Sequence, residues 1–587
     1  MKHGMITSAS GWRKVFAASG DENDKSEKIT EDDRILAAVA ADVFSDYIAE
    51  KSSEPLLVLG MDTRPTGRAL ALSMLQLLIA KKISVKFPGV IAAPEIMAYG
   101  KTASGFIYIS ASHNPIGHNG IKFGLNDGGV LNGQENAKLV KALNEKCASE
   151  SEITRIKSLL DSVSDSDLER VLSASAESKA ESLKIYEDFS KEVISAGNSK
   201  IFSKIQTELS KDSKKSIGII ADMNGSARTL SIDSSLFEST GINFYALNNE
   251  PGKIEHAIIP EPENLVWCAG EMEKLRKEGH SDVCLGYMPD CDGDRGNIVF
   301  WNEKTSRAEV LKAQEVFALS VLSELSYMKY LGEKSKLAVA ANCPTSMRID
   351  EITAAFGAEL FRAEVGEANV VNLARKKRDE GFAVRILGEG SNGGNITHPA
   401  AVRDPLNTIF ALVKLLVLRD SESSKGLFHI WCDARNLPYN NDFTLADVLE
   451  TLPEYTTTGV AEERAILKIK TTEHSLLKGN FQKIFEEEWN LKKSELAAKY
   501  GIESYEAIGT NGTEESRNLS DYSKNGKGGL KILFYDKNKN PLAYIWMRGS
   551  GTEPVFRVLC DVKGNNSVEE HELLDWERGI ILKADEI

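Results

Sequence analysis

A serine stands at the end of a predicted strand in the run Ile-Tyr-Ile-Ser-Ala-Ser-His-Asn-Pro, which covers residues 107–115. Ser112 is flanked by hydrogen-bonding side chains and followed by Pro115, which stops regular structure. We expect its hydroxyl to be held exposed in a fixed pose, as a nucleophile or the carrier of a covalent group requires. An ordinary polar turn has the same composition, so the interpretation depends on the other polar loops of the chain.

The loop Asp290–Arg295 carries three carboxylates at alternate positions. Asp290, Asp292 and Asp294 can converge in an extended loop, where their mutual repulsion would be costly without a cation. Hard oxygen ligands in this number fit Mg²⁺. A solvated acidic turn is one alternative. An EF-hand is another, but the sixth residue is not glycine and the twelfth is Trp301 rather than glutamate.

Two further loops have the composition of binding sites. Arg548–Pro554, with Arg557 beyond it, combines glycines, hydroxyls and a guanidinium, which together suit a phosphate. It lacks the Lys-Ser/Thr ending and the following helix of a Walker loop, and a glycine-rich hairpin turn is the alternative. Gly388–Ser391 offers a carboxylate and a hydroxyl on a flexible turn, which suits sugar hydroxyls but is a weak signal alone.

Predicted strands precede these loops. Apolar runs at 56–59 and 83–87 enclose a periodic helix and form a β-α-β unit, and the strand at 106–109 leads to Ser112. Similar patterns begin at 216 and 337, and a smaller α+β region begins near 444, with the hairpin-like pair 530–535 and 543–547. Residues 134–212 are rich in Lys, Glu, Ser and Ala, and we interpret them as helices and an exposed insertion.

Composition limits the class of protein. A chain of 587 residues is too long for one core, and its 42% hydrophobic content is typical of a globular protein. The net charge of −15 argues against nucleic acid and an anionic membrane as partners. Seven scattered cysteines form no C-x-x-C pair, residues 1–16 lack a hydrophobic signal core, and the apolar run at 69–80 is too short to span a bilayer. These features predict a cytoplasmic protein.

The motifs, in this order, resemble those of the α-D-phosphohexomutase family, which includes phosphoglucomutases and phosphomannomutases. The matching segments are Ser10–Arg13, Ser110–Pro115 with Asn119–Phe123, Asp290–Arg295, Gly388–Ser391 and Arg548–Pro554. The resemblance spans nearly the whole chain. It implies an α/β fold of three similar mixed α/β domains in series plus a smaller C-terminal α+β domain around a central active-site cleft. We place these domains at residues 1–212, 213–334, 335–440 and 441–587.

The same resemblance implies a Mg²⁺-dependent mutase that interconverts hexose 1-phosphate and hexose 6-phosphate through a phosphoserine and a bisphosphorylated sugar. Ser112 would carry the phosphoryl group, and one Mg²⁺ would be bound by the Ser112 phosphate and the three aspartates. Arg13, Lys122 and His113 are expected at the reacting centre. We expect Lys122 to be the general acid/base, which requires a lowered pKa, and His113 to act through hydrogen bonds. The residues assigned to substrate are Arg295, Glu389, Ser391, Arg548, Ser550, Gly551, Thr552 and Arg557.

Departures from the family pattern leave the sugar open. Gly393 stands where many phosphomannomutase-like members have histidine, and Gly390 replaces the second glutamate of the phosphoglucomutase Glu-Glu-Ser sequence. The turn Glu364–Ala368 lacks the usual Lys or His, and Arg403–Pro405 stands where a basic-Asp-Gly sequence is usual. We expect glucose, with a phosphomannomutase or phosphoglucosamine mutase as the alternatives. A non-catalytic sugar-phosphate-binding paralogue and a Mg²⁺ phosphatase are alternatives of other classes.

The resemblance also implies the partners. We expect small-molecule hexose phosphates as the ligands, a sugar 1,6-bisphosphate as the activator, and a monomer or weak homodimer.

Overall fold

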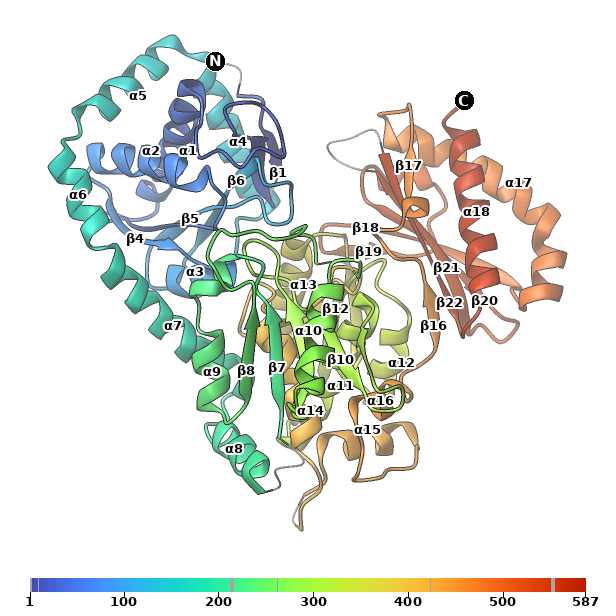
Figure 1. Cartoon of the computed structure of the whole chain (residues 1–587). Coiled ribbons are helices and arrows are strands. Elements are labelled where there is room, and N and C mark those ends of the chain that lie inside the picture. Colours follow the sequence, from blue (N-terminus) through green and yellow to red (C-terminus); the bar gives the residue numbers. More distant parts are fainter. Residues whose placement is uncertain (1–2, 9, 212–215, 261, 423, 550–554) are drawn as a thin grey trace. The chain divides into compact units, whose positions relative to one another are not determined.

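The computed structural model describes residues 3–8, 10–211, 216–260, 262–422, 424–549 and 555–587. The chain divides into two compact units (Figure 1). The first comprises Met1–Leu311 and Ile396–Leu418, and the second comprises Lys312–Asn395 and Arg419–Ile587. Each unit has its own sheets and hydrophobic cores.

A six-stranded sheet of order β1-β2-β6-β5-β3-β4 carries the serine loop. Leu57 and Leu59 of β3 pack with α1 and α2, whereas Val58 packs with α3 on the opposite face. This alternation is that of a strand buried on both sides. The strands are β1 (Ile6–Ser8), β2 (Gly11–Val15), β3 (Leu56–Met61), β4 (Ser84–Val90), β5 (Gly105–Ile109) and β6 (His118–Leu125), and the helices are α1 (Glu31–Ala49), α2 (Gly67–Ala80) and α3 (Ala93–Gly100). The parallel pairing of β3 with β4 across α2 confirms the predicted β-α-β unit.

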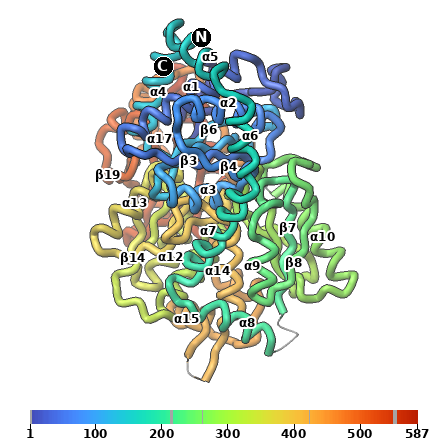
Figure 2. Tube along the Cα trace, turned by 90° about the vertical axis from the view of Figure 1, so that its left-hand side faces the viewer, coloured from blue at the N-terminus to red at the C-terminus, as the bar shows by residue number. Residues whose placement is uncertain are grey.

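The segment predicted as an exposed insertion forms five helices, which follow one another along the first unit (Figure 2). They are α4 (Gly133–Ala148), α5 (Glu150–Ser162), α6 (Asp165–Ser173), α7 (Ser175–Ser195) and α8 (Ile201–Lys211). α6 has no buried residue, as expected, but the exposed-insertion prediction is wrong for α7. Ser182, Tyr186 and Val193 of α7 are buried because this helix packs against α3, β4 and α14. Serine and alanine on a helix face allow such close packing, so a polar composition did not mean a solvated face.

A five-stranded sheet of order β11-β10-β9-β7-β8 completes the first unit and carries the aspartate loop between β9 and β10. Its strands are β7 (Gly218–Asp222), β8 (Asn243–Leu247), β9 (Val283–Met288), β10 (Asn297–Asn302) and β11 (Arg307–Val310), with helices α9 (Asp233–Ser239) and α10 (Val266–Lys277). The short strand β15 (Ile396–Thr397) and helix α14 (Pro405–Val417) also belong to this unit. Phe410 of α14 stacks on Phe237 of α9 at a ring distance of 5.5 Å.

The second unit begins with a parallel arrangement in which β12 pairs with both β13 and β14. The predicted sugar loop follows β14. The elements are α11 (Ala313–Tyr330), β12 (Leu337–Asn342), α12 (Arg348–Ala355), β13 (Glu359–Ala363), α13 (Glu367–Asp379), β14 (Ala383–Gly388), α15 (Leu427–Arg435) and α16 (Leu445–Leu449).

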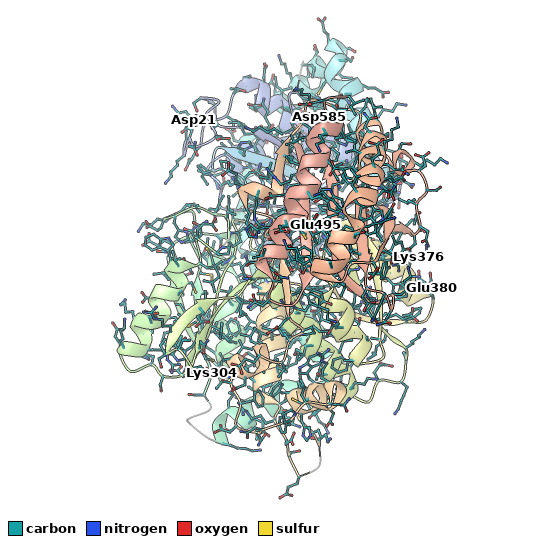
Figure 3. All side chains as sticks on the ribbon, turned by 90° about the vertical axis from the view of Figure 1, so that its right-hand side faces the viewer. Asp21, Lys304, Lys376, Glu380, Glu495 and Asp585 are labelled. Carbon is teal, nitrogen blue, oxygen red and sulfur yellow. The ribbon has the colours of Figure 1, made fainter. Side chains whose placement is uncertain are left out.

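The last sheet is antiparallel, with the order β16-β22-β21-β20-β18-β19 and β17 paired to β22. Its elements are β16 (Tyr455–Thr457), β17 (Ile466–Lys468), α17 (His474–Tyr500), β18 (Ser504–Asn511), β19 (Glu514–Ser516), β20 (Gly529–Tyr535), β21 (Pro541–Gly549), β22 (Val555–Lys563) and α18 (Ser567–Ala584). α17 and α18 cover one face of the sheet, and charged residues such as Glu495 lie on their outer side (Figure 3). The pairing of β20 with β21 confirms the predicted hairpin.

The four sheets confirm the predicted fold class, mixed α/β sheets in series followed by a smaller α+β part. The domain boundaries at 212, 334 and 440 remain predictions. Among the helices of the described residues, none is long and apolar enough to cross a membrane.

Candidate active site

The turn between β5 and β6 places the predicted nucleophile against the aspartate loop. Ser112 has a left-handed backbone (φ +53°), and its N–H donates to Ser110 Oγ at 2.9 Å. Its hydroxyl donates to Asp290 Oδ2 at 2.5 Å. The prediction of an exposed hydroxyl is wrong, since Ser112 is only 5% exposed. The strained backbone of a non-glycine residue at this position is typical of functional turns.

Arg64 fixes the serine turn from behind, and the sequence reasoning missed it. Its two terminal nitrogens donate to four backbone carbonyls of the turn, and its Nε lies 3.3 Å from the buried Asp62 carboxylate. The acceptors are the carbonyls of Ser112 (2.6 Å), Asn114 (2.6 Å), Pro115 (2.6 Å) and His118 (3.1 Å). The Asp-Thr-Arg-Pro sequence after the first predicted strand was the available signal, but only the fold shows which carbonyls the guanidinium contacts.

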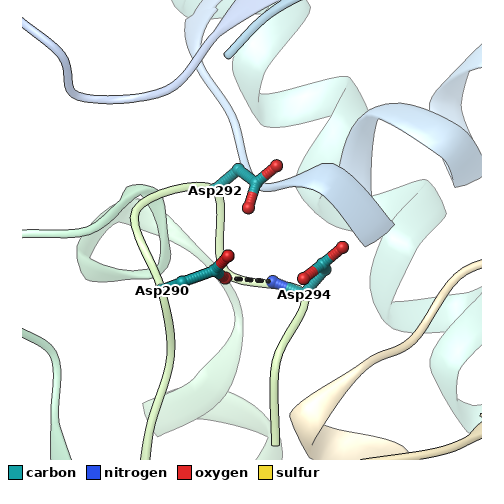
Figure 4. A group of neighbouring side chains, drawn as sticks. All are labelled: Asp290, Asp292 and Asp294. Carbon is teal, nitrogen blue, oxygen red and sulfur yellow. Dashed lines mark hydrogen bonds between the residues drawn. The ribbon is translucent and has the colours of Figure 1, made fainter. Parts of the chain in front are cut away.

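Three buried carboxylates converge in the loop between β9 and β10 (Figure 4). The oxygens of Asp290, Asp292 and Asp294 lie within 4.8 Å of one another. Burial and the two neighbouring carboxylates raise the pKa of Asp290 well above its ordinary value. Asp292 Oδ1 is buried and has no hydrogen-bond donor among the described residues. Converging carboxylates, one of them with an unpaired oxygen, are the hard oxygen ligands that Mg²⁺ takes, so these residues fit the ion.

A second buried arginine supports the aspartate loop. Arg228 donates to the backbone carbonyl of Gly293 at 3.2 Å and pairs with Asp233 at 2.9 Å. Its Nη1 also contacts Tyr186 of α7 at 3.2 Å, and the Tyr186 hydroxyl donates to Asp404 at 2.7 Å. The helical segment at 134–212 therefore contributes a side chain to the support of the aspartate loop.

Lys122 of β6 reaches the carboxylate cluster, and Arg403 reaches it from the segment before α14. Lys122 Nζ donates to Asp292 Oδ2 at 2.6 Å, and Arg403 Nη2 donates to Asp294 Oδ2 at 3.1 Å. Burial lowers the pKa of Lys122, but Asp292 and Asp294 outweigh it and raise the pKa above the ordinary value. The lowered pKa expected for Lys122 is therefore not found in this arrangement. The sequence reasoning had not linked Arg403 to this loop.

Two further cations and a histidine surround the serine. Arg295 Nη2 donates to His113 Nδ1 at 3.1 Å, and this nitrogen lies 3.4 Å from Ser112 Oγ. Burial, Arg295 and Arg13 lower the pKa of His113 to about 2, so the imidazole is neutral. Arg13 Nε is buried without a hydrogen-bond partner among the described residues. A buried guanidinium with an unpaired nitrogen, near enough to His113 to lower its pKa, is suited to an anion such as a phosphoryl group.

The predicted sugar loop in the second unit is held by hydrogen bonds, so its description as a flexible turn is wrong. Glu389 Oε1 accepts from Asn342 Nδ2 at 2.9 Å and from the N–H of Gly366 at 2.8 Å. Its Oε2 accepts from Asn392 Nδ2 at 2.9 Å. A Cβ at Gly390 would lie 2.3 Å from Gln314 Oε1. The Gln314 side chain therefore fills the space that a side chain at position 390 would need.

Arg548 and Arg557, which the sequence assigned to phosphate, lie opposite each other on β21 and β22. Arg548 Nε contacts Glu364 Oε1 at 3.0 Å, whereas Arg557 Nη1 donates to the carbonyl of Val460 at 3.3 Å. The sequence reasoning named Glu364 only as part of a turn that departs from the family pattern and did not predict its contact with Arg548. Ser550, Gly551 and Thr552 lie outside the described residues.

The structure thus brings together two sets of predicted residues. The first unit holds Ser112, His113, Lys122, Arg13, Arg295 and the three aspartates, whereas the second unit holds Glu389, Ser391, Arg548 and Arg557.

Comparison with known proteins gives consistent matches. The family model described as phosphoglucomutase/phosphomannomutase, alpha/beta/alpha domain I, matches residues 10–149, and that of domain III matches residues 319–431. The phosphoglucomutase/phosphomannomutase of Thermococcus kodakarensis is 24% identical over 95% of this chain and 96% of its own. The phosphoglucosamine mutase of Campylobacter curvus is 24% identical over 70% of this chain and 81% of its own.

Solved structures share the fold. The phosphoglucomutase parafusin from Paramecium, in its open form, aligns with a TM-score of 0.62 at 15% identity, covering 100% of this chain and 96% of its own. A phosphoglucomutase/phosphomannomutase family protein from Burkholderia thailandensis aligns with a TM-score of 0.60 at 15% identity, covering 99% and 97%.

The sheets show the mixed α/β fold shared with the phosphohexomutase structures above. The two family-model matches, with relatives that align over most of the chain, support membership of the phosphoglucomutase/phosphomannomutase family.

Proposed function

We propose that this chain interconverts the 1-phosphate and 6-phosphate of a hexose, with glucose as the favoured sugar. The observation that carries the proposal is the 2.5 Å hydrogen bond from Ser112 Oγ to Asp290, within a cluster of three buried carboxylates. It places a hydroxyl that can carry a phosphoryl group beside a set of ligands that fits Mg²⁺. Three nearby cationic side chains, Arg13, Arg295 and Lys122, complement the charge of that group.

In the proposed reaction, phosphorylated Ser112 gives its phosphoryl group to a sugar hydroxyl. The bond from phosphorus to Ser112 Oγ breaks as the bond to the sugar oxygen forms, and the hydroxyl proton passes to Ser112 Oγ. The bisphosphorylated sugar then reorients and returns its other phosphate to the serine. Mg²⁺ bound by the three aspartates and the Ser112 phosphate would supply positive charge to the transferring group. A sugar 1,6-bisphosphate would restore the phosphoserine when the intermediate is lost.

The side chains near Ser112 have separate tasks in this proposal. Arg13 and Arg295 stabilise the charge that spreads over the transferring group. His113 stays neutral and accepts from Arg295, which fixes that guanidinium beside the serine. Lys122 remains our candidate for relaying the proton, and its raised pKa makes the ammonium form the resting one. Near-normal turnover with an unchanged pH profile in Lys122→Met would place the proton relay elsewhere.

Substrate recognition is proposed for the second unit. Glu389 and Ser391 contact the sugar, and Arg548 with the residues at 550–552 binds the phosphate that is not transferred. Glu389 accepts three hydrogen bonds from neutral N–H donors, so the ionised carboxylate has capacity for about one further donor, such as a sugar hydroxyl. Glucosamine, the sugar named for the Campylobacter relative, therefore stays an alternative to glucose.

The test is a turnover panel with Mg²⁺ and catalytic glucose 1,6-bisphosphate. It compares glucose 1-phosphate, mannose 1-phosphate and glucosamine 1-phosphate, with Ser112→Ala as the control. We expect conversion of glucose 1-phosphate to glucose 6-phosphate, and loss of that conversion in the control. Conversion of another sugar would correct the substrate, whereas no conversion of any sugar would favour the non-catalytic paralogue.

A further inference from the structure

Residues 364–366, here named the strap, connect the two substrate-binding features of the second unit. The strap follows β13, and the N–H of Glu364 donates to the carbonyl of Gly512 at 2.9 Å. The Glu364 side chain, at one end of the strap, contacts Arg548, and the N–H of Gly366, at the other end, donates to Glu389. Three consecutive residues therefore lie between the proposed phosphate anchor and the proposed sugar loop.

The Glu364 carboxylate accepts three hydrogen bonds and forms an ion pair with Arg548. Oε1 accepts from the N–H of Val365 at 2.7 Å and contacts Arg548 Nε at 3.0 Å. Oε2 accepts from Thr510 Oγ1 at 2.9 Å and from the N–H of Gly529. All four partners carry an N–H or O–H group, and an ionised carboxylate presents only acceptors to them. Glu364 is 5% exposed and is fixed to β18 and β20.

The contact at Nε determines how Arg548 presents its charge. The Nε is buried 3.0 Å from Glu364 Oε1, an ion-pair contact without hydrogen-bond geometry, and the terminal nitrogens make no hydrogen bond to the described residues. This ion pair holds the Nε side of the guanidinium against Glu364, so the terminal nitrogens remain available for an anion. The Arg548 side chain is 33% exposed, which leaves room for such a ligand.

The other end of the strap fixes the sugar loop. Gly366 has φ +122°, a conformation that glycine adopts readily, and this directs its N–H to Glu389 Oε1 at 2.8 Å. Lys478 of α17 adds support near the first end, because its ammonium donates to the carbonyls of Gly526 and Gly528 next to Gly529. The separation between Arg548 and Glu389 is thereby set by bonded and hydrogen-bonded neighbours.

We propose that Glu364 is a positioning residue for substrate binding, which orients Arg548 toward the non-transferred phosphate and sets its distance from the sugar loop through Gly366. This inference rests on the proposed function, since it needs Arg548 to bind that phosphate. Glu364 belongs to the second unit, whereas the proposed chemistry is assigned to residues of the first, so we expect its replacement to weaken substrate binding and to leave the chemistry intact.

The experiment compares Glu364→Gln, Arg548→Ala and the double variant in the full chain. In Glu364→Gln the amide presents a donor to at least one of four donor partners, so the fixed arrangement is lost. We expect KM for the hexose phosphate to rise by about 10- to 100-fold, with kcat nearly unchanged. Competitive inhibition by inorganic phosphate weakens in parallel. In the Arg548→Ala background, Glu364→Gln adds little, because both changes act through one contact.

The matched control is Glu506→Gln on β18, which removes a glutamate–arginine pair with Arg517 in the same sheet. We expect its KM and phosphate inhibition to match the wild type. A raised KM in Glu506→Gln comparable with that of Glu364→Gln would reduce the effect to general loosening of the sheet and overturn the inference.

The remaining outcomes separate the inference from the proposed function. If Arg548→Ala raises KM but Glu364→Gln does not, the inference is wrong and the proposed function stands. If Arg548→Ala leaves KM unchanged in an active enzyme, the phosphate role of Arg548 fails and the inference fails with it. If the wild type turns over no hexose phosphate, the proposed function itself is wrong.

Discussion

Replacing Arg64 with lysine should disturb the serine turn. The guanidinium donates to four backbone carbonyls of the turn, and three of these bonds are 2.6 Å long. A lysine ammonium is a single point of charge on a flexible stem and cannot span carbonyls from Ser112 to His118. We expect Arg64→Lys to lose at least two of the four hydrogen bonds.

The magnitude follows from the type of bond. Hydrogen bonds to a charged group contribute about 1.5–3 kcal/mol each, so losing two removes about 3 kcal/mol or more of support from the turn. The left-handed backbone of Ser112 costs about 1–2 kcal/mol. With only two of the four Arg64 hydrogen bonds left, the stabilisation of the turn exceeds this cost by a smaller amount than in the wild type. The turn should then relax, and kcat should fall by about a hundredfold.

The assay combines urea unfolding of the first unit with turnover of the hexose phosphate found in the substrate panel. Arg68→Lys is the matched control, because Arg68 is exposed and lies four residues further along the same segment. An Arg64→Lys variant with the wild-type unfolding midpoint and wild-type kcat would refute the reasoning that these bonds hold the serine in place.

Three other changes test the surroundings of the site. Tyr186→Phe removes the hydroxyl that donates to Asp404 and should lower the free energy of unfolding of the first unit, measured in urea, by about 1–3 kcal/mol. Because Arg228 contacts both this hydroxyl and the aspartate loop, activation by Mg²⁺ should also weaken. Burial lowers the pKa of His256, but its hydrogen bond to Asp222 outweighs burial, so the pKa is raised in the folded state. The stability that His256 contributes is therefore full below its unfolded pKa of about 6.5 and is lost as pH rises through the folded pKa. Urea unfolding from pH 6 to 9 should show this loss in the wild type and not in His256→Gln. Glu577 is buried, and neither of its oxygens has a hydrogen-bond partner in the part of the chain that the structure describes. Burial raises its pKa, so the second unit should lose stability as pH rises above about 4.5, and Glu577→Gln should remove this loss between pH 5 and 8.

Local sequence patterns predicted many of the helices and strands and the residues that could take part in catalysis or binding, because strands, turns and acidic loops have short-range signals. The convergence of the aspartates at 290, 292 and 294 could be predicted from their spacing, and the turn carrying Ser112 from the residues that end its strand. Both predictions concern side chains that lie close together in sequence.

What the sequence did not predict depends on partners distant in the chain. The carbonyls that Arg64 contacts lie 48 to 54 residues away, and Tyr186 meets Asp404 across 218 residues. The carboxylate of Glu364 accepts hydrogen bonds from Thr510 and Gly529 and pairs with Arg548, and only the pairing of strands brings these residues near. The pKa of Lys122 likewise depends on Asp292, which is remote in the sequence.

Transfer of a labelled phosphoryl group to Ser112 tests the central claim most directly. The protein is incubated with Mg²⁺ and glucose 1,6-bisphosphate that carries labelled phosphate, and the modified residue is located by mass spectrometry. The account predicts label on Ser112, none in Ser112→Ala, and return of the label to glucose phosphate when unlabelled glucose 6-phosphate is added. Label on another residue, or its release only as inorganic phosphate, would contradict the account.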